Sequence, residues 1–343
     1  MRQIHVILLF SAWLVASCAP EPGHAPGASP AMKVECRVKT TPVKDQGASS
    51  LCWAYAMLAT IESEHLMKGD SVNLSATFVA RQLIEAQCPR LYFSGGGGPL
   101  RLRGMGTTLA DCIARFGAAP YDSYPDPPHA QYGVLVRKLR LTARDHARKG
   151  KGLAAFQQSV EQLLDDALGP APATHVYMLG AEYTPLEFAH SVCAPDEYLA
   201  LTSCTHHPFN TWFEMETPDN WSHDRCLNLP LDSLMAHIDR ALRAGHPVCW
   251  EGDTSNGEAD NLFAHVAGPV SQARRQRSLE SLQTTDDHAM ELTGIVSHNG
   301  RKYYQCKNSY GTEWGDRGFG YLSESYLRLY TVAVIMTREA YSL

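Results

Sequence analysis

The chain has 343 residues and a formal net charge of −6, with 44% apolar and 19% charged residues. This length is enough to bury a large core without metals or disulfides as its main support. The acidic balance argues against nucleic acid as a main partner. The basic stretch at residues 137–151 has no aromatic interleaving, so it indicates a solvated helix face rather than a binding patch.

The first residues predict export. Residues 4–16 are apolar but too short to span a membrane. They lead into Val15-Ala16-Ser17-Cys18, which resembles the lipobox of bacterial lipoproteins, where the cysteine becomes the lipidated first residue. We therefore expect a signal segment at 1–18, a tether rich in Pro, Gly and Ala at 19–35, and a membrane-anchored protein on the periplasmic or cell-surface side. A cleaved signal peptide with an incidental cysteine is the alternative.

Export would place the 10 cysteines in an oxidising compartment. Setting aside Cys18 and Cys52, which have other predicted roles, leaves an even number that permits full pairing but does not define it. The sequence has no C-x-x-C pair, and the adjacent His206 and His207 lack a second ligand pair. We therefore expect no metal site and no cofactor.

Regular structure is predicted most clearly near the two ends of the chain. Residues 52–68 have apolar side chains at helical spacing after a turn-and-cap segment, so Cys52 is placed at a helix N-terminus. Amphipathic helices are also expected at 153–168 and 230–244. Towards the C-terminus, the patterns predict strands over residues 289–297, 301–307 and 331–336, with Asn299-Gly300 as a hairpin turn between the first two. These elements indicate an α+β fold.

The hairpin would bring His288 and Asn308 to the same end of adjacent strands. A thiol attacks an amide as its thiolate, and both a helix N-terminus and an imidazolium favour that form of Cys52. Asn308 could accept the other ring N–H of His288 and so fix its orientation. Gln46, six residues before Cys52, could stabilise an oxyanion together with the backbone N–H of Cys52.

The segments around these residues resemble those of the papain-like cysteine peptidases. Residues 46–53, Gln-Gly-Ala-Ser-Ser-Leu-Cys-Trp, are similar to the active-site segment of that family. Residues 287–290 and 307–315 are similar to its His and Asn segments. Within the family, residues 284–290 and Gly245-His246-Pro247-Val248 resemble the bleomycin hydrolase and aminopeptidase C branch.

The resemblance implies a papain-like domain over residues 36–343, with a helical N-terminal half, an antiparallel-sheet C-terminal half and a cleft between them. It implies a cysteine-type peptidase that acts on peptides or proteins through a thiolate–imidazolium pair and an acyl-enzyme. In this interpretation Cys52 is the nucleophile, His288 the base, Asn308 the residue that orients it, and Gln46 part of the oxyanion hole.

The glycine-rich loop at residues 95–98 resembles the glycines with which the family binds substrate backbone. On that resemblance we assign Gly97 and Gly98 to substrate binding, together with Trp314. A flexible surface loop is the alternative. The sequence departs from the family pattern at Tyr310, where the family usually has tryptophan; an aromatic ring there would still shield the bond between the catalytic His and Asn.

Several alternatives stay open at this point. In the bleomycin hydrolase branch a C-terminal arm limits cleavage to amino-terminal residues, but only residues 337–343 follow the last predicted strand. Aminopeptidase or endopeptidase action and the oligomeric state are therefore left open. An inactive lipid-anchored peptide-binding protein with the same fold is the main alternative function. An acyl or amide transferase that passes the thioester to an amine is another.

Overall fold

The computed structural model describes residues 32–343 except 129, 172–174, 257 and 261, so the signal segment and Cys18 lie outside the described residues. The predicted tether extends too far. Residues 33–35 belong to strand β1 (Lys33–Arg37), in which Lys33 pairs with Ser297 on the sheet. The domain therefore begins close to Met32.

Most of the longer helices come from the first half of the described chain, as predicted. The bounds predicted for α1 and α5 are confirmed, and α7 lies one residue inside its predicted range at each end. Among the described residues, no helix combines the length and the apolar character needed to cross a membrane. The helices are α1 (Cys52–Lys68), α2 (Ala76–Phe93), α3 (Gly106–Phe116), η1 (Tyr121–Ser123), α4 (Tyr132–Arg148), α5 (Leu153–Leu168), α6 (Pro185–Val192), α7 (Leu231–Arg243), α8 (Gln272–Glu280), α9 (Glu324–Tyr330) and α10 (Arg338–Tyr341).

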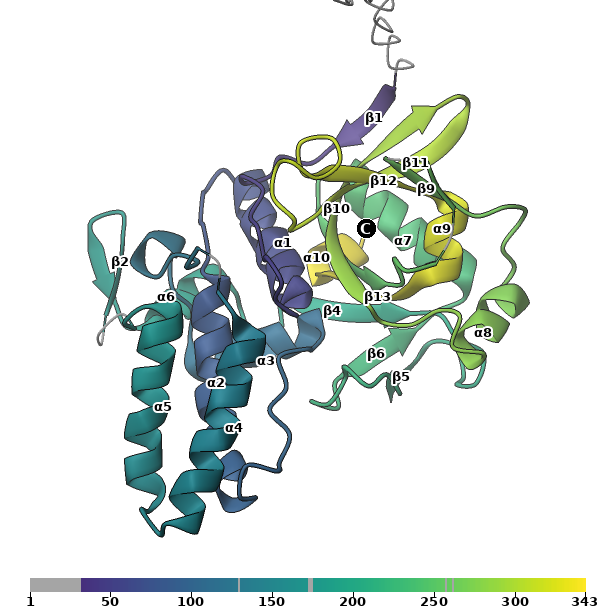
Figure 1. Ribbon diagram of the computed structural model, residues 1–343. Coiled ribbons are helices and arrows are strands. Elements are labelled where there is room, and N and C mark those ends of the chain that lie inside the picture. The colour runs from purple at the N-terminus through teal and green to yellow at the C-terminus, as the bar shows by residue number, and fades with distance from the viewer. Residues whose placement is uncertain (1–31, 129, 172–174, 257, 261) are drawn as a thin grey trace, which may run out of the picture. The chain divides into compact units, whose positions relative to one another are not determined.

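A mixed sheet of 11 strands dominates the second half (Figure 1). Its order is β5-β6-β4-β13-β7-β10-β11-β12-β9-β8, and β1 also pairs with β10; β2 and β3 form a separate hairpin. Most pairs are antiparallel as predicted, but β4 with β6 and β9 with β12 are parallel. The strands after β1 are β2 (Val176–Met178), β3 (Ala181–Tyr183), β4 (Tyr198–Thr202), β5 (Thr211–Glu214), β6 (Arg225–Asn228), β7 (Val248–Gly252), β8 (Glu258–Asp260), β9 (Phe263–His265), β10 (His288–His298), β11 (Arg301–Lys307), β12 (Phe319–Ser323) and β13 (Thr331–Thr337).

The predicted hairpin forms between β10 and β11. Its turn residues Asn299 and Gly300 both have positive φ, 50° and 75°, as a type I′ turn requires. Glu291 lies opposite Lys307 near the other end of the pair. The hairpin therefore brings His288, the first residue of β10, close to Asn308, which follows β11.

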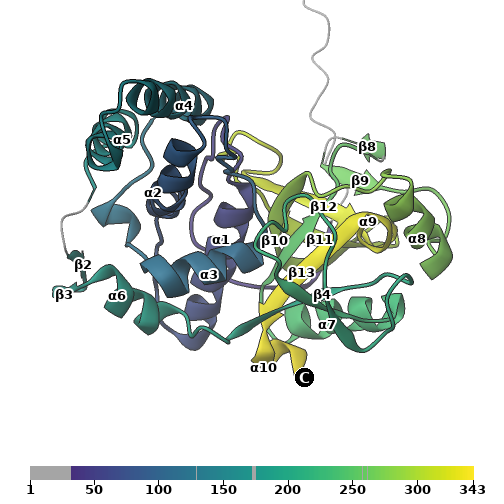
Figure 2. The ribbon, with the colours of Figure 1, turned by 90° about the horizontal axis from the view of Figure 1, so that it is seen from below.

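The sheet has a buried core on each of its faces, because side chains alternate along a strand. Along β7, Val248 and Trp250 join the core that includes α7, whereas Cys249 joins the core of the helical half. Helix α1 packs against β10 and β7 on the face of the sheet that Cys249 occupies. Helices α2, α4 and α5 lie beyond α1 (Figure 2). Cys52, at the start of α1, thus lies where the helical half meets the sheet.

Every cysteine among the described residues is a free thiol. Cys36 and Cys52 are half-buried, and the others are buried within the cores. Hydrophobic burial and polar contacts therefore stabilise this domain without covalent cross-links in its described part.

Candidate active site

The thiol of Cys52 lies at the junction of α1 and β10. Cys52 is the first residue of α1, and Leu51 before it is fully buried, which anchors the start of the helix. The side chain of Leu51 supplies no capping hydrogen bond, so N–H groups of the first turn are left available. The backbone N–H groups of Ala289 and Trp53 lie near enough to the sulfur to lower the pKa of the thiol, against the effect of burial. The thiol is therefore held beside the residue that follows His288.

His288 is fixed by Asn308, as the sequence predicted from the hairpin. The two side chains are joined by a hydrogen bond of 2.8 Å between Nε2 and Oδ1. The same amide oxygen accepts the backbone N–H of Ser309 at 2.8 Å, which holds the Asn308 side chain in place. Because Oδ1 is an acceptor, Nε2 of His288 carries the proton and Nδ1 has a free electron pair. That nitrogen can take a proton from a nucleophile.

The ring of Tyr310 covers His288. The two rings stack with centroids 4.9 Å apart and an interplanar angle of 26°, while Trp314 meets Tyr310 edge-on at 6.0 Å. The expected aromatic shield is therefore present. Tyr310 also adds a group that tryptophan lacks at this position: its hydroxyl lies 3.4 Å from Nδ1 of His288.

Gln46 is held by Ser309, whose role the sequence analysis missed. The Ser309 hydroxyl donates to Oε1 of Gln46 at 2.6 Å, and the backbone N–H of Gln46 donates to the Ser309 carbonyl at 2.8 Å. Nε2 of Gln46 donates one hydrogen to the carbonyl of Ser49 at 2.9 Å. An amide nitrogen carries two hydrogens, so one remains for an oxyanion.

Burial acts against both charges of the expected thiolate–imidazolium pair. It raises the pKa of Cys52 to about 11, and the charge of Asp286 adds to this rise while the N–H of Ala289 opposes it. Burial also lowers the pKa of His288, against the hydrogen bond to Asn308. The charged pair must therefore be stabilised by the attraction between its two members and by the N-terminus of α1.

The described hydrogen bonds of Gly97 and Gly98 are with Ser94 and Arg140 rather than with Cys52, and their role in substrate binding stays a prediction. The backbone N–H of Gly98 donates to Ser94 at 2.7 Å, and its carbonyl accepts from Arg140 on α4 at 2.8 Å. A Cβ at neighbouring Gly96 would lie 2.4 Å from the carbonyl oxygen of Arg140. The glycines thus allow the end of α2 to approach α4 closely.

A different segment, residues 101–106, runs beside Cys52. The indole of Trp53 donates to the carbonyl of Leu102 at 2.8 Å, and a Cβ at Gly104 would lie 3.2 Å from that indole. Arg103 in the same segment lies near enough to lower the pKa of Cys52. The pair Gly104 and Gly106 was the only sequence signal for this close approach, and it was weaker than the four-glycine run upstream.

A pocket of about 420 Å³ adjoins His288 and Asn308. It is lined in part by His288, Asn308, Tyr310 and Trp314, so the structure brings the predicted substrate-binding residue Trp314 together with the catalytic candidates. A Cβ at Gly320 would lie 2.8 Å from the Trp314 ring, which shows how closely that strand supports the indole.

Two carboxylates outside the predicted set hold the loop at one wall of this pocket. Asp287 accepts the backbone N–H groups of Thr254 at 2.7 Å and Ser255 at 3.1 Å. Asp253 accepts the backbone N–H of Thr285 at 2.8 Å. The segments on either side of the loop are therefore tied to the chain just before His288.

The C-terminal residues lie away from the cleft. Helix α10 packs against α7, where Tyr341 stacks on His237 with centroids 4.5 Å apart. Ala340 is fully buried there. These contacts hold the last residues against α7.

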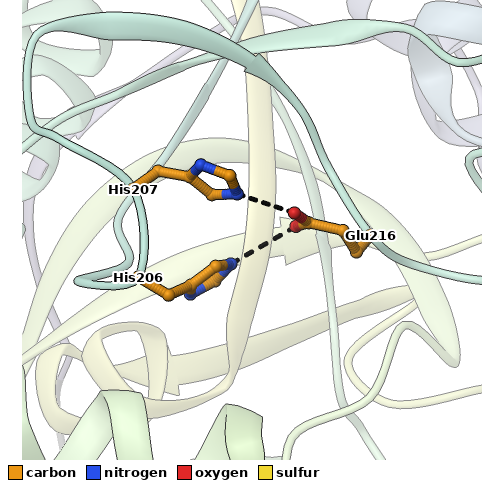
Figure 3. Close-up of side chains that lie close together, drawn as sticks. All are labelled: His206, His207 and Glu216. Carbon is orange, nitrogen blue, oxygen red and sulfur yellow. Dashed lines mark hydrogen bonds and ion pairs between the residues drawn. The ribbon is translucent and has the colours of Figure 1, made fainter.

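His206, His207 and Glu216 form a cluster with possible metal-ligand atoms within 4.8 Å of one another (Figure 3). The hydrogen bonds around His206 do not suit a metal. Oε1 of Gln276 accepts the backbone N–H of Thr205 at 2.6 Å, so its Nε2 donates to Nδ1 of His206 at 2.9 Å. The proton of that ring is therefore on Nε2, which faces Glu216, whereas a metal needs this nitrogen bare.

Comparisons with known proteins agree with the fold. Residues 173–342 match the Peptidase C1-like family. The crystal structure of PepW from Lactobacillus rhamnosis HN001 superposes with a TM-score of 0.70 over 90% of this chain and 82% of that one, at 18% identity, which shows a shared fold. The structural likeness shows a papain-like fold, and the matched segment, slightly less than half of the chain, supports a cysteine-type peptidase.

The curated relatives that it matches are two aminopeptidases of Lactobacillus delbrueckii subsp. lactis. Aminopeptidase W is 23% identical over 269 residues, which cover 67% of this chain and 61% of that protein. Aminopeptidase G is 23% identical over 360 residues, with 88% of this chain and 82% of that protein covered. The match thus spans less than two thirds of the length of aminopeptidase W.

Proposed function

We propose that the protein hydrolyses peptide bonds as a cysteine-type peptidase, with Cys52 as the nucleophile. The observation that carries the proposal is the arrangement at the start of β10. The thiol of Cys52 lies near the backbone N–H of Ala289, and the adjacent His288 is held by Asn308, which leaves the electron pair of Nδ1 to accept a proton. Both groups belong to one site at the junction of the helical half and the sheet.

The reaction follows from these positions. The sulfur of Cys52 attacks the substrate carbonyl carbon while its proton passes to Nδ1 of His288. The oxyanion is stabilised by the free N–H of Gln46 and the backbone N–H of Cys52. The C–N bond then breaks, the proton on His288 goes to the leaving amine, and a thioester remains. Water, deprotonated by His288, releases the acid and restores the thiol.

Trimming from the amino terminus is the more specific proposal. It is supported by the names of the two curated relatives, both of which are aminopeptidases. A mixed peptide library read by mass spectrometry would test it. Removal of single amino-terminal residues is expected, and cuts confined to internal bonds would contradict it.

Labelling of Cys52 tests the enzyme proposal itself. Soluble protein lacking residues 1–18 is treated with an epoxide inhibitor of thiol peptidases, with Cys52→Ala and Cys36→Ser alongside. Cys36 is the other half-buried thiol, so it is the matched control. We expect labelling and library cleavage in the wild type and in Cys36→Ser, and neither in Cys52→Ala. A folded wild type that is unlabelled and leaves the library intact would favour an inactive peptide-binding protein.

We also propose that the chain is exported and anchored by lipid at Cys18, on the periplasmic or cell-surface side. The support is the apolar segment at 4–16 and the run Val15-Ala16-Ser17-Cys18. Bacteria fed an alkyne fatty acid would test it. The wild type should carry the label in the membrane fraction, and Cys18→Ala should not. Processing of the wild type without lipid would indicate an ordinary signal peptide instead.

A further inference from the structure

The pocket beside His288 has no part in the chemistry described above. Its volume of about 420 Å³ is within the usual range for ligand sites in proteins. The exposed or half-buried members of its lining are residues 254–256, Ala264 and Trp314. The buried members include Met290, Cys306 and Leu322, on three neighbouring strands of the sheet. The pocket therefore runs from an accessible mouth to a buried apolar floor.

The lining favours an apolar occupant. Apart from His288, none of the described residues that line the pocket has an ionisable acidic or basic side chain of the Asp, Glu, Lys or Arg type. The Thr254 hydroxyl already donates to Asp287 at 3.1 Å. The Ser255 hydroxyl donates to Asp253 at 3.0 Å. A charged group would lose its water shell here without a counter-charge, whereas an apolar side chain gains from its removal from water.

The position of the pocket relative to the reacting groups decides which part of a substrate reaches it. His288 is among the described residues that line the pocket, and Cys52 is not. Tyr310, whose hydroxyl lies 3.4 Å from Nδ1 of His288, lines it as well. In the proposed reaction the acyl half of the substrate is joined to the sulfur, and the amine half takes its proton from His288. The pocket thus adjoins the leaving half.

Both sides of the mouth are held in place before a substrate arrives. On one side, Asp253 and Asp287 fix the loop at residues 254–256 through the hydrogen bonds given above. On the other side, the indole of Trp314 lies against β12 at Gly320. A side chain that enters meets a mouth that is already ordered, which lowers the entropy cost of binding.

We propose that this pocket binds the side chain of the substrate residue directly after the scissile bond, and that it selects a large apolar or aromatic side chain there. The proposal rests on the peptidase function proposed above and names a substrate class for it. Ala264 is the specificity-determining residue, because it is half-buried in the lining and a larger side chain there would take up part of the pocket.

A series of matched peptides tests the wild type. The peptides differ only in the residue after the cleaved bond, which is phenylalanine, leucine, alanine or aspartate. We expect kcat/KM for the phenylalanine and leucine peptides to exceed that of the alanine peptide by about 10- to 100-fold, with aspartate poorest. Equal values for leucine, phenylalanine and alanine, or the highest value for aspartate, would overturn the proposal.

Competition between amines and water tests the pocket in the reverse direction. An activated ester forms the thioester on Cys52, and an added amino acid amide then attacks its carbonyl. The C–S bond breaks, an amide bond forms, and the proton of the amine passes by way of His288 to the sulfur. The attacking amine occupies the place of the leaving amine. We therefore expect leucinamide to capture about tenfold more acyl groups than alaninamide at equal concentration, measured by mass spectrometry; equal capture contradicts the pocket.

The variant Ala264→Leu reduces the space in the pocket. We expect both ratios, leucine to alanine in kcat/KM and leucinamide to alaninamide in capture, to fall towards one. Ala167→Leu adds the same group at a half-buried alanine on α5 and is the control, which should keep both ratios. Thermal unfolding establishes that each variant is folded. A folded Ala264→Leu that keeps the wild-type ratios would overturn the assignment of Ala264.

Failure of the pocket and failure of the enzyme give different results. Without the pocket, the wild type shows no preference, but Cys52 is still labelled and peptides and esters are still cleaved. A wild type that forms no acyl-enzyme and cleaves no peptide rejects the peptidase function, and the pocket with it. If Ala264→Leu does not fold, the peptide series and the amide competition on the wild type decide.

Discussion

The hydroxyl of Tyr310 is the residue-scale feature that most changes how the site should behave. It lies 3.4 Å from Nδ1 of His288, the nitrogen that must accept the proton of Cys52. A donor at that distance stabilises the neutral imidazole and competes with the thiol for its electron pair. Tyr310 is 42% exposed, so its substitution should leave the core intact.

We therefore expect Tyr310→Phe to lower the pKa of the Cys52 thiol. The loss of one hydrogen bond of ordinary strength corresponds to a shift of about half to one pH unit. The measurement is the rate of Cys52 alkylation by iodoacetamide as a function of pH, since only the thiolate reacts. Tyr183→Phe, on the β2–β3 hairpin, is the control. Superimposable profiles for wild type and Tyr310→Phe would show that the hydroxyl does not influence the pair.

Ser309 should act through Gln46. Its hydroxyl fixes the amide of Gln46 at 2.6 Å, so Ser309→Ala should lower kcat by about tenfold or more because an oxyanion donor loses its position. The alkylation rate of Cys52 should not change. A double variant with Gln46→Ala should be no slower than Gln46→Ala alone, since both changes remove the same interaction. Independent, multiplying effects would contradict this role.

The residues that the sequence predicted well are those whose partners are set by local geometry. Cys52 follows from helix spacing, and His288 and Asn308 follow from a two-residue turn. The contact between Ser309 and Gln46 could not be found in this way. It joins residues that are 263 positions apart in the chain, and nothing in the local sequence of either one defines it.

At the scale of elements, a buried network ties α1 to the segment before it and to the sheet. Glu62 on α1 is fully buried and accepts hydrogen bonds from Lys44 at 2.5 Å, from the backbone N–H of Leu74 at 2.7 Å, and from Thr41. Lys307 on β11 donates to Thr41 at 3.0 Å. The network therefore links the helix that begins with Cys52 to the strand that leads to Asn308.

Removal of Glu62 should be strongly destabilising, because Lys44 would lose its buried counter-charge. We expect Glu62→Ala to lower the free energy of unfolding by about 3–5 kcal/mol, measured by urea denaturation. Glu197→Ala is the control, since its pair with Lys68 is more exposed and should cost at most about 1 kcal/mol. Equal losses in the two variants would show that the network has no special importance.

Helices and strands, like the site residues, were predictable where the local sequence defines them and not where distant pairing does. Helix α5 has clear apolar periodicity, α1 lies between a turn-and-cap segment and Gly69, and β10 and β11 flank a strong turn signal, so their positions were predictable. The short strands β4, β5 and β6 were not, because they are defined by pairing with β13 and with one another. The neighbours of the glycine-rich loop at 95–98 were not predictable either, because a run of glycines indicates backbone freedom but not which element it approaches.

At the scale of the whole molecule, an ion pair links α1 to the loop between α7 and β7. Nδ1 of His246 lies 3.0 Å from Glu64, and both side chains are buried. The hydrogen bond to Glu64 raises the pKa of His246 above its usual value, against the effect of burial. The protonated pair therefore contributes to stability between two parts of the fold that are distant in sequence.

A raised folded-state pKa means that this contribution is complete below the unfolded pKa of about 6.5. It is lost as the pH rises through the higher pKa of the folded state. The difference in unfolding free energy between wild type and His246→Asn should thus be largest near about pH 6 and decrease above it. Urea titrations at a series of pH values measure it. A difference that does not vary with pH would mean that His246 contributes only neutral contacts.

The free thiols have a practical consequence for handling the protein. Apart from Cys36 and Cys52, the described cysteines are buried in the two cores, and no described cysteine forms a disulfide. Millimolar dithiothreitol should therefore leave the melting temperature unchanged, which a thermal scan with and without it would establish. A drop on reduction would reveal a bond that the fold needs. The reducing conditions that keep the thiol of Cys52 reactive should therefore not destabilise the fold. The protein can be stored with a reductant, which protects Cys52 from oxidation.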